Sequence, residues 1–124
     1  MSETSFTPTL FLKQGCPFCL KVRLFLLESG QLDQVRIREF SPGTPEETEI
    51  RTLLAAVLDK VSFPTAELSS GKYLADSDGI IAHFAERAGV DPADLPTYRS
   101  YIDGVFQRVG ALFRENKELK SQLA

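Results

Sequence analysis

Two cysteines at an expected strand-to-helix junction constrain the fold more than any other feature of this sequence. Cys16 and Cys19 are the only cysteines among the 124 residues, and two residues separate them. The apolar run at residues 9–12 is typical of a buried strand that ends in a loop. Pro17 suits the first position of a helix, and Gly30 suits its left-handed C-cap. The sequence therefore predicts a strand leading into a helix whose first turn carries C-x-x-C.

This placement favours redox chemistry. The free N–H groups and the dipole of a helix N-terminus stabilise an anion, and Cys16 as a thiolate would be that anion. Cys19 lies about one turn further along the same face, within reach of a disulfide. We expect Cys16 to attack and Cys19 to resolve, with Lys13 adding a positive charge nearby. The alternative is that both cysteines are small buried hydrophobic residues.

The rest of the chain predicts a mixed α/β domain. Period-two alternation indicates a second strand at residues 35–38, and Thr44 with Pro45 and Glu47 forms a helix start of the capping-box type. Residues 63–75 predict a hairpin, and residues 76–89 a further helix that ends at Gly89. The order β-α-β-α-β-β-α gives a four-stranded sheet with one parallel crossover and two antiparallel strands. The apolar stripe expected on the second helix consists of Ile50, Leu53, Leu54, Val57 and Leu58.

Composition excludes several classes of protein. Fourteen basic against seventeen acidic residues give a net charge of −3, which argues against a nucleic-acid binder. No apolar run approaches the ~20 residues that span a bilayer, and the first nine residues do not resemble a signal peptide. Two cysteines and the single histidine, His83, cannot complete a four-ligand zinc site. We expect a cytoplasmic protein without a metal, whose cysteine pair works in a reducing compartment.

Two further segments could contribute to a site. Phe63-Pro64 precedes an apolar strand. We expect its peptide bond to be cis and to face the cysteine pair, which would expose the Phe63 backbone as an edge on which a peptide-like substrate can pair. Asp76-Ser77-Asp78 caps the next helix, whose free N–H groups can bind a carboxylate while an aspartate accepts from an amino group. The plain alternatives are a strand start and a helix cap. Lys21, Arg23, Arg36 and Arg38 are expected to face solvent.

Taken together, these segments resemble the glutaredoxin family. The closely related N-terminal domain of glutathione S-transferases is the second match. The resemblance spans roughly Thr9 to Val90 and rests on Lys13–Cys19, Val61–Pro64 and Leu74–Ile80. It implies an α/β, thioredoxin-like (glutaredoxin) fold with a four-stranded mixed sheet and an additional C-terminal helix. The domains expected from it are a thioredoxin-fold domain at residues 1–90 and a helical extension at residues 91–124.

The resemblance also implies roles for individual residues. Cys16 and Cys19 correspond to the nucleophile and the resolving cysteine. The residues matched to glutathione binding are Lys13, Phe18, Phe63, Pro64, Asp76, Ser77 and Asp78. The implied function is glutathione-dependent reduction of mixed disulfides, with glutathione as co-substrate and glutathionylated or disulfide compounds as partners.

Two alternatives differ in class from this oxidoreductase. One is a transferase-like glutathione-binding protein, because Leu74-Ala75-Asp76-Ser77 is similar to the acidic-serine motif of transferases. The other is an iron–sulfur or partner-binding module with little turnover, in which Cys16 of two chains and two glutathiones would bridge a cluster. Against the transferase alternative, only a short segment follows Gly89, and the dithiol favours redox chemistry.

The terminal segment has a pattern that the resemblance does not explain. Apolar residues recur every three or four positions, with one asparagine among them. The members of this series are Tyr98, Ile102, Val105, Val109, Leu112, Asn116, Leu119 and Leu123. Such a heptad seam predicts pairing of helices, so we expect a homodimer through the C-terminal helix. The alternative is a helix folded back on its own domain, and Gly104 and Gly110 weaken the coiled-coil interpretation.

Overall fold

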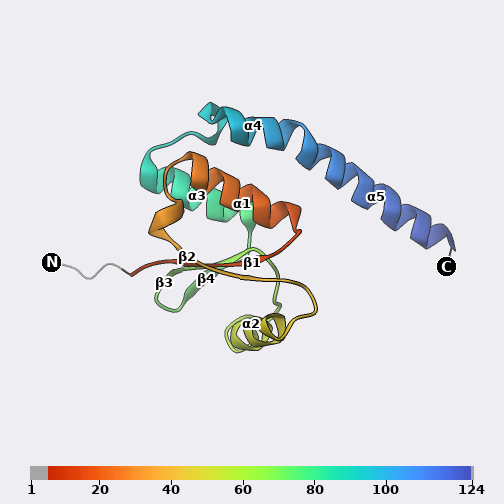
Figure 1. Ribbon diagram of the computed structural model, residues 1–124, viewed down its shortest axis with the longest axis horizontal. Coiled ribbons are helices and arrows are strands. Elements are labelled where there is room, and N and C mark those ends of the chain that lie inside the picture. The colour runs from red at the N-terminus through yellow and green to blue at the C-terminus, as the bar shows by residue number, and fades with distance from the viewer. Residues whose placement is uncertain (1–5, 124) are drawn as a thin grey trace.

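The computed structural model describes residues 6–123 and shows a mixed four-stranded sheet in the order β2-β1-β3-β4. Helices α1 and α3 cover one face, α2 covers the other, and α4 and α5 lie outside α1 (Figure 1). The strands are β1 (Thr9–Lys13), β2 (Arg36–Phe40), β3 (Thr65–Ser69) and β4 (Lys72–Leu74). The helices are α1 (Pro17–Glu28), α2 (Pro45–Ala55), α3 (Ser77–Ala88), α4 (Pro96–Asp103) and α5 (Val105–Leu123), with 3-10 turns η1 (Leu32–Gln34) and η2 (Pro92–Asp94). The predicted fold class is confirmed.

Strand β1 lies between β2 and β3, and its alternate side chains point to opposite faces of the sheet. It pairs in parallel with β2 and antiparallel with β3, which in turn pairs antiparallel with β4. Leu10 and Leu12 join the core under α1 and α3, whereas Phe11 joins Phe40 and Ile50 in the core under α2. The predicted second strand is shifted: it runs from Arg36 to Phe40, because its pairing extends along β1 as far as Lys13.

Helix α2 departs from its expected apolar stripe. Ile50 and Leu54 are fully buried, but Leu53 and Val57 are largely exposed, and the helix ends at Ala55 before Val57 is reached. Beyond the end of the helix, Leu58 and Val61 are partly buried and pack against the same core. Helix α1 also keeps Leu20 and Leu27 exposed to solvent.

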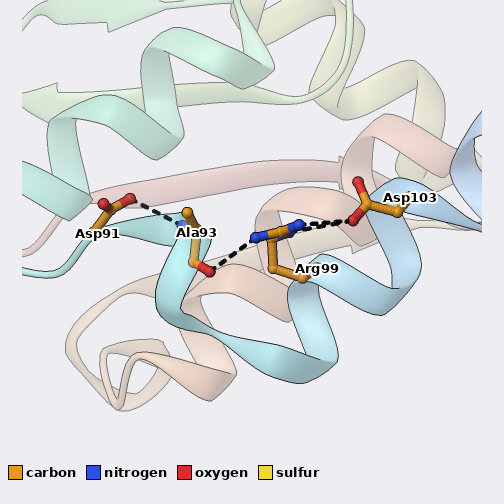
Figure 2. Close-up of polar contacts among 4 residues, drawn as sticks. All are labelled: Asp91, Ala93, Arg99 and Asp103. Atoms are coloured by element: carbon orange, nitrogen blue, oxygen red, sulfur yellow. Dashed lines mark hydrogen bonds and ion pairs between the residues drawn. The ribbon is translucent and has the colours of Figure 1, made fainter.

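The connection from α3 to α4 is fixed by polar contacts (Figure 2). Asp91 accepts a hydrogen bond from the Ala93 N–H at 2.9 Å, and Arg99 donates to the Ala93 carbonyl at 3.2 Å. Arg99 also pairs with Asp103 one turn further on. On the inner side, the carboxylate of Glu28 at the end of α1 accepts from two free N–H groups of the first turn of α4. These contacts anchor α4 alongside α1.

The terminal segment is helical as predicted, but Gly104 divides it. The backbone of Gly104 has φ −114° and ψ −94°, which ends α4, and α5 begins at the next residue. Tyr98 of α4 is buried edge-on against Phe25, with 5.6 Å between ring centroids. The later part of α5 extends away from the sheet and leaves Leu112, Phe113 and Leu119 exposed (Figure 1). None of the helices within residues 6–123 is long and apolar enough to cross a membrane.

Candidate active site

The cysteine pair lies where β1 meets α1. Cys16 is the N-cap residue of α1 and is partly buried, while Cys19 is only 3% exposed. Pro17 occupies the first turn, so the helix starts immediately after Cys16. The backbone N–H of Lys13 donates to Sγ of Cys19 at 3.3 Å, which ties the inner sulfur to the end of β1. Both thiols are free.

The two thiols have opposite electrostatic environments. A hydrogen bond from the Cys19 thiol is the main cause that lowers the pKa of Cys16 to about 6. Burial opposes this effect, and the N–H groups of Cys19 and Phe18 and the charge of Lys13 support it. The pKa of Cys19 is raised, because its proton is held in that hydrogen bond and because the sulfur is buried. At neutral pH the pair therefore consists of a Cys16 thiolate and a Cys19 thiol.

A cavity of about 330 Å³ opens beside the pair. Its lining combines β1, the loop, α1, β2 and both terminal helices. The lining residues are Leu12, Lys13, Gly15, Cys16, Pro17, Cys19, Leu20, Arg23, Glu39, Tyr101, Val105 and Val109. Because Cys16 is partly exposed in this cavity, a small molecule inside it would lie next to the thiolate.

The terminal helices complete the cavity, which was not predicted from the sequence. Tyr101 of α4 donates its hydroxyl to the Pro17 carbonyl at 2.8 Å, and burial together with the negative charge of Cys16 raises its pKa. Phe106 of α5 packs edge-on against Phe18 at 5.2 Å between centroids. The predicted heptad series contains neither Tyr101 nor Phe106, and no local motif connects Tyr101 to Cys16.

Lys21 was expected to face solvent, and this expectation is wrong. Its side chain is 6% exposed, and its ammonium lies 5.6 Å from the Phe18 ring centroid and 5.0 Å from that of Phe106. The same ammonium pairs with Asp78 at the start of α3, at 2.7 Å. Favourable contact with the two rings and with one carboxylate offsets the desolvation of the ammonium. Lys21 thus connects α1, α3 and α5.

The other predicted site segments lie around the same core. The Phe63–Pro64 bond is cis, as predicted, and Phe63 packs against the cluster that contains Cys19. Asp76 caps α3 by accepting from the Gly79 N–H at 3.0 Å, and Ser77 is buried in the first turn. Of the residues matched to glutathione, only Lys13 lines the cavity beside Cys16. The roles of all these residues in binding or catalysis stay predictions.

Within residues 6–123, no group of three or more histidine, cysteine, aspartate or glutamate side chains is close enough together to hold a metal ion. His83 stands edge-on to Phe84, with 5.0 Å between ring centroids. Its place in the helix is therefore explained by packing.

Comparisons with known proteins agree with the fold. The family model described as the N-terminal domain of glutathione S-transferase matches residues 10–93. Among solved structures, glutathione transferase Omega 3C from Trametes versicolor is similar, with a TM-score of 0.54 and 18% identity over 81% of this chain. The match covers 43% of the transferase chain, so this protein spans less than half of that length. No curated protein matches significantly. The chain belongs to the family of glutathione S-transferase N-terminal domains, which have the thioredoxin-like fold.

Proposed function

We propose that this protein is a glutathione-dependent thiol–disulfide oxidoreductase that removes glutathione from mixed disulfides. The observation that carries the proposal is the pairing of a low-pKa, partly exposed Cys16 with a buried, protonated Cys19. A purely structural pair would need neither exposure nor a lowered pKa. The thiolate is the nucleophile in disulfide exchange, and a pKa near ambient pH combines a high thiolate fraction with good nucleophilicity.

The proposed reaction conserves electrons in each step. The Cys16 thiolate attacks the glutathione sulfur of a mixed disulfide, and the bond between the two substrate sulfurs breaks. The electron pair leaves with the substrate sulfur, which takes a proton from water. A second glutathione thiolate then attacks the glutathione sulfur on Cys16, which releases glutathione disulfide and restores the Cys16 thiolate. Alternatively Cys19, after losing its proton, displaces glutathione, and two glutathione molecules reduce the resulting Cys16–Cys19 disulfide.

Glutathione binding is the second part of the proposal. We place the peptide backbone of glutathione along Phe63 and its γ-glutamyl end at the start of α3, where Asp76 and Ser77 lie. The charge of Lys13 favours the glycyl carboxylate near Cys16. Phe18, Pro64 and Asp78 would border this strip. The match to the transferase family and the buried helix start at Ser77 support this placement.

A glutathionylated-substrate reduction assay tests the proposal. Cys16→Ser is expected to abolish activity, because no thiolate remains to accept glutathione. Cys19→Ser is expected to retain turnover through the route that uses a second glutathione. Unchanged activity in Cys16→Ser, or no activity in the unmodified protein, would refute the proposal.

A transferase-like activity is the second candidate, favoured by the apolar wall that α4 and α5 add to the cavity. In that case Cys16 would stabilise or bind glutathione while an electrophile occupies the wall of Val105 and Val109. Conjugation of glutathione to a small electrophile, unchanged in Cys19→Ser, would favour this candidate over disulfide reduction.

We further propose a division into a thioredoxin-fold domain at residues 1–90 and a helical extension at residues 91–124, working in the reducing cytoplasm. A second copy of this chain is the proposed partner of the exposed part of α5. The heptad seam there places Asn116 at a core position. Glu115 and Lys120 lie at flanking positions, where Glu115 of one chain would pair with Lys120 of a parallel second copy. Light scattering of the full chain tests the dimer.

A further inference from the structure

The hydroxyl of Tyr101 contacts the dipeptide that separates the two cysteines. It donates a hydrogen bond to the carbonyl oxygen of Pro17 at 2.8 Å. Tyr101 belongs to α4, 84 residues further along the chain, so this bond connects the terminal helices to the first turn of α1. The Pro17 carbonyl and the Phe18 N–H are the two ends of one planar peptide group. A donor at the oxygen therefore also affects the Phe18 N–H.

The Phe18 N–H is one of the groups that stabilise Cys16 as a thiolate. Cys16 is the N-cap residue of α1, and Phe18 occupies the second helical position, where the N–H has no partner inside the helix. This N–H lowers the pKa of Cys16. Because the Cys16 side chain makes no full cap hydrogen bond with the helix, the N–H acts on the sulfur mainly as a nearby dipole. Its effect depends on the orientation and the polarisation of the peptide group.

Tyr101 keeps its proton over the pH range in which Cys16 ionises. Burial and then the negative charge of Cys16 raise the pKa of Tyr101. The hydroxyl is therefore a donor at every pH at which the thiolate forms. The effect of Cys16 on Tyr101 also indicates that the two groups lie within electrostatic reach of each other. The other charged or titratable groups in the lining beside Cys16 are Lys13, Cys19, Arg23 and Glu39.

Packing and the anchoring of α4 hold the Tyr101 ring in place. The ring contacts Phe106 with 5.6 Å between centroids, and Phe106 packs edge-on against Phe18 at 5.2 Å. Glu28 accepts from the first N–H groups of α4, which ties this helix to the end of α1. The hydroxyl is thus ordered before any reaction takes place, so little conformational entropy is lost when the thiolate forms.

We propose that Tyr101 is a positioning residue for the nucleophile: its hydroxyl orients and polarises the Pro17–Phe18 peptide group, and this group stabilises the Cys16 thiolate. Hydrogen bonds in a chain strengthen one another, because a carbonyl that accepts a proton donor makes the N–H of the same peptide more positive. The inference rests on the proposed function, since it names a further residue that supports the same nucleophile. Through this contact the terminal helices influence the reactivity of Cys16.

Tyr101→Phe removes the hydroxyl but keeps the aromatic ring and every charge of the site. The rate of alkylation of Cys16 by iodoacetamide is followed from pH 4.5 to 9, and its midpoint is expected to be roughly 0.3 units higher in this variant. Such a shift results if the hydroxyl strengthens the N–H by about one fifth. From a pKa of about 6, the variant should react about 1.5-fold more slowly at pH 6 and at a similar rate at pH 8.5.

The amide NMR signal of Phe18 gives a second measurement over the same pH range. This signal should titrate together with Cys16, and the amplitude of its shift should be smaller in Tyr101→Phe, because a less polarised N–H responds less to the thiolate. A hydroxyl that only fastens α4 to α1 would change stability in urea without changing this amplitude or the alkylation midpoint.

Tyr98→Phe is the matched control. It removes a tyrosine hydroxyl from the same helix, but Tyr98 packs on Phe25 and not on Pro17. The control should leave the alkylation midpoint unchanged. An unchanged midpoint in Tyr101→Phe would overturn the inference. The same shift in both variants would also overturn it, because loosening of α4 would then be the cause.

Turnover separates this inference from the proposed function. Reduction of a glutathionylated substrate is measured at pH 6 and pH 8.5 for the unmodified protein and for Tyr101→Phe. A kcat/KM that is about 1.5-fold lower in the variant at pH 6 only would support both proposals. If the unmodified protein reduces no disulfide while the alkylation midpoint still shifts, the proposed function fails and the positioning of Cys16 by Tyr101 stands. If disulfides are reduced and the midpoint does not shift, the proposed function stands and the inference fails.

Discussion

Removing the thiol proton of Cys19 is the sharpest perturbation of the site. The hydrogen bond from Cys19 is the largest cause of the lowered pKa of Cys16. Cys19→Ala deletes this donor but leaves the N–H of Phe18 and the charge of Lys13 in place. Cys19→Ser is the matched variant, because its hydroxyl keeps a donor at the same position. The alanine variant is therefore expected to raise the pKa of Cys16, and the serine variant to raise it less.

The size of the shift follows from the strength of the lost bond. A hydrogen bond to a charged group contributes about 1.5–3 kcal/mol, and one pKa unit corresponds to about 1.4 kcal/mol. Since Cys16 is partly exposed, solvent screening places the effect at the lower end, roughly one unit. The pKa would move from about 6 to roughly 7. At pH 6 the thiolate fraction then falls from about one half to about one tenth.

The rate of alkylation by iodoacetamide measures this fraction directly. The protein is kept reduced, and modification of Cys16 is followed by mass spectrometry between pH 4.5 and 9. Cys19→Ala should react about fivefold more slowly than the unmodified protein at pH 6 and at a similar rate at pH 8.5, where both are thiolates. A midpoint that stays near pH 6 in Cys19→Ala would show that the helix N-terminus alone sets the pKa. Faster alkylation of Cys19 than of Cys16 at neutral pH would refute the assigned roles.

Three further predictions concern the scaffold and are measured by urea unfolding. Asp78→Asn should lower the free energy of unfolding by about 1 kcal/mol more than Lys21→Met does. The reason is that Asp78→Asn leaves a buried ammonium without its carboxylate, whereas Lys21→Met removes the ammonium. Burial opposes ionisation of Glu28, but the two N–H groups of α4 lower its pKa overall. Its stabilising effect relative to Glu28→Gln should therefore be complete above about pH 4.3 and be lost as pH falls through the lowered pKa. Gly89→Ala should cost about 1 kcal/mol, since φ is +67° at this C-cap.

Local patterns predicted the central part of the fold well. Alternate residues of β1 enter separate cores, and the capping signals of α3 at Asp76 and Gly89 coincide with its ends. In contrast, pairing rather than composition sets the length of β2, which extends to Phe40 opposite Lys13. Apolar periodicity also overstated the buried face of α2, because Leu53 belongs to the predicted stripe but is exposed.

The site was predictable only where it is local in sequence. Cys16, Cys19 and Lys13 lie within one strand-to-helix connection, so their proximity follows from spacing. Arg23, Glu39 and Tyr101 come from α1, β2 and α4, and only the packed structure brings them to one cavity. The burial of Lys21 was not predictable for the same reason. Phe106, which lies next to its ammonium, is 85 residues away in the sequence, so the residues around Lys21 give no sign of this contact.

The heptad pattern of the terminal segment combines two separate requirements. At the first position of the series, Tyr98 packs on Phe25 in the core. Further along, Val105 and Val109 line the cavity beside Cys16. The break at Gly104 lies between these roles, so the series is not one continuous seam. Beyond Gly110, Leu112, Phe113 and Leu119 present exposed apolar side chains that a second copy could cover. A chain ending at Gly110 would keep the cavity and lose this face. Because the cavity lining ends at Val109 and the exposed face begins at Leu112, the disulfide reduction of this shortened chain reports on the cavity and its oligomeric state reports on the exposed face.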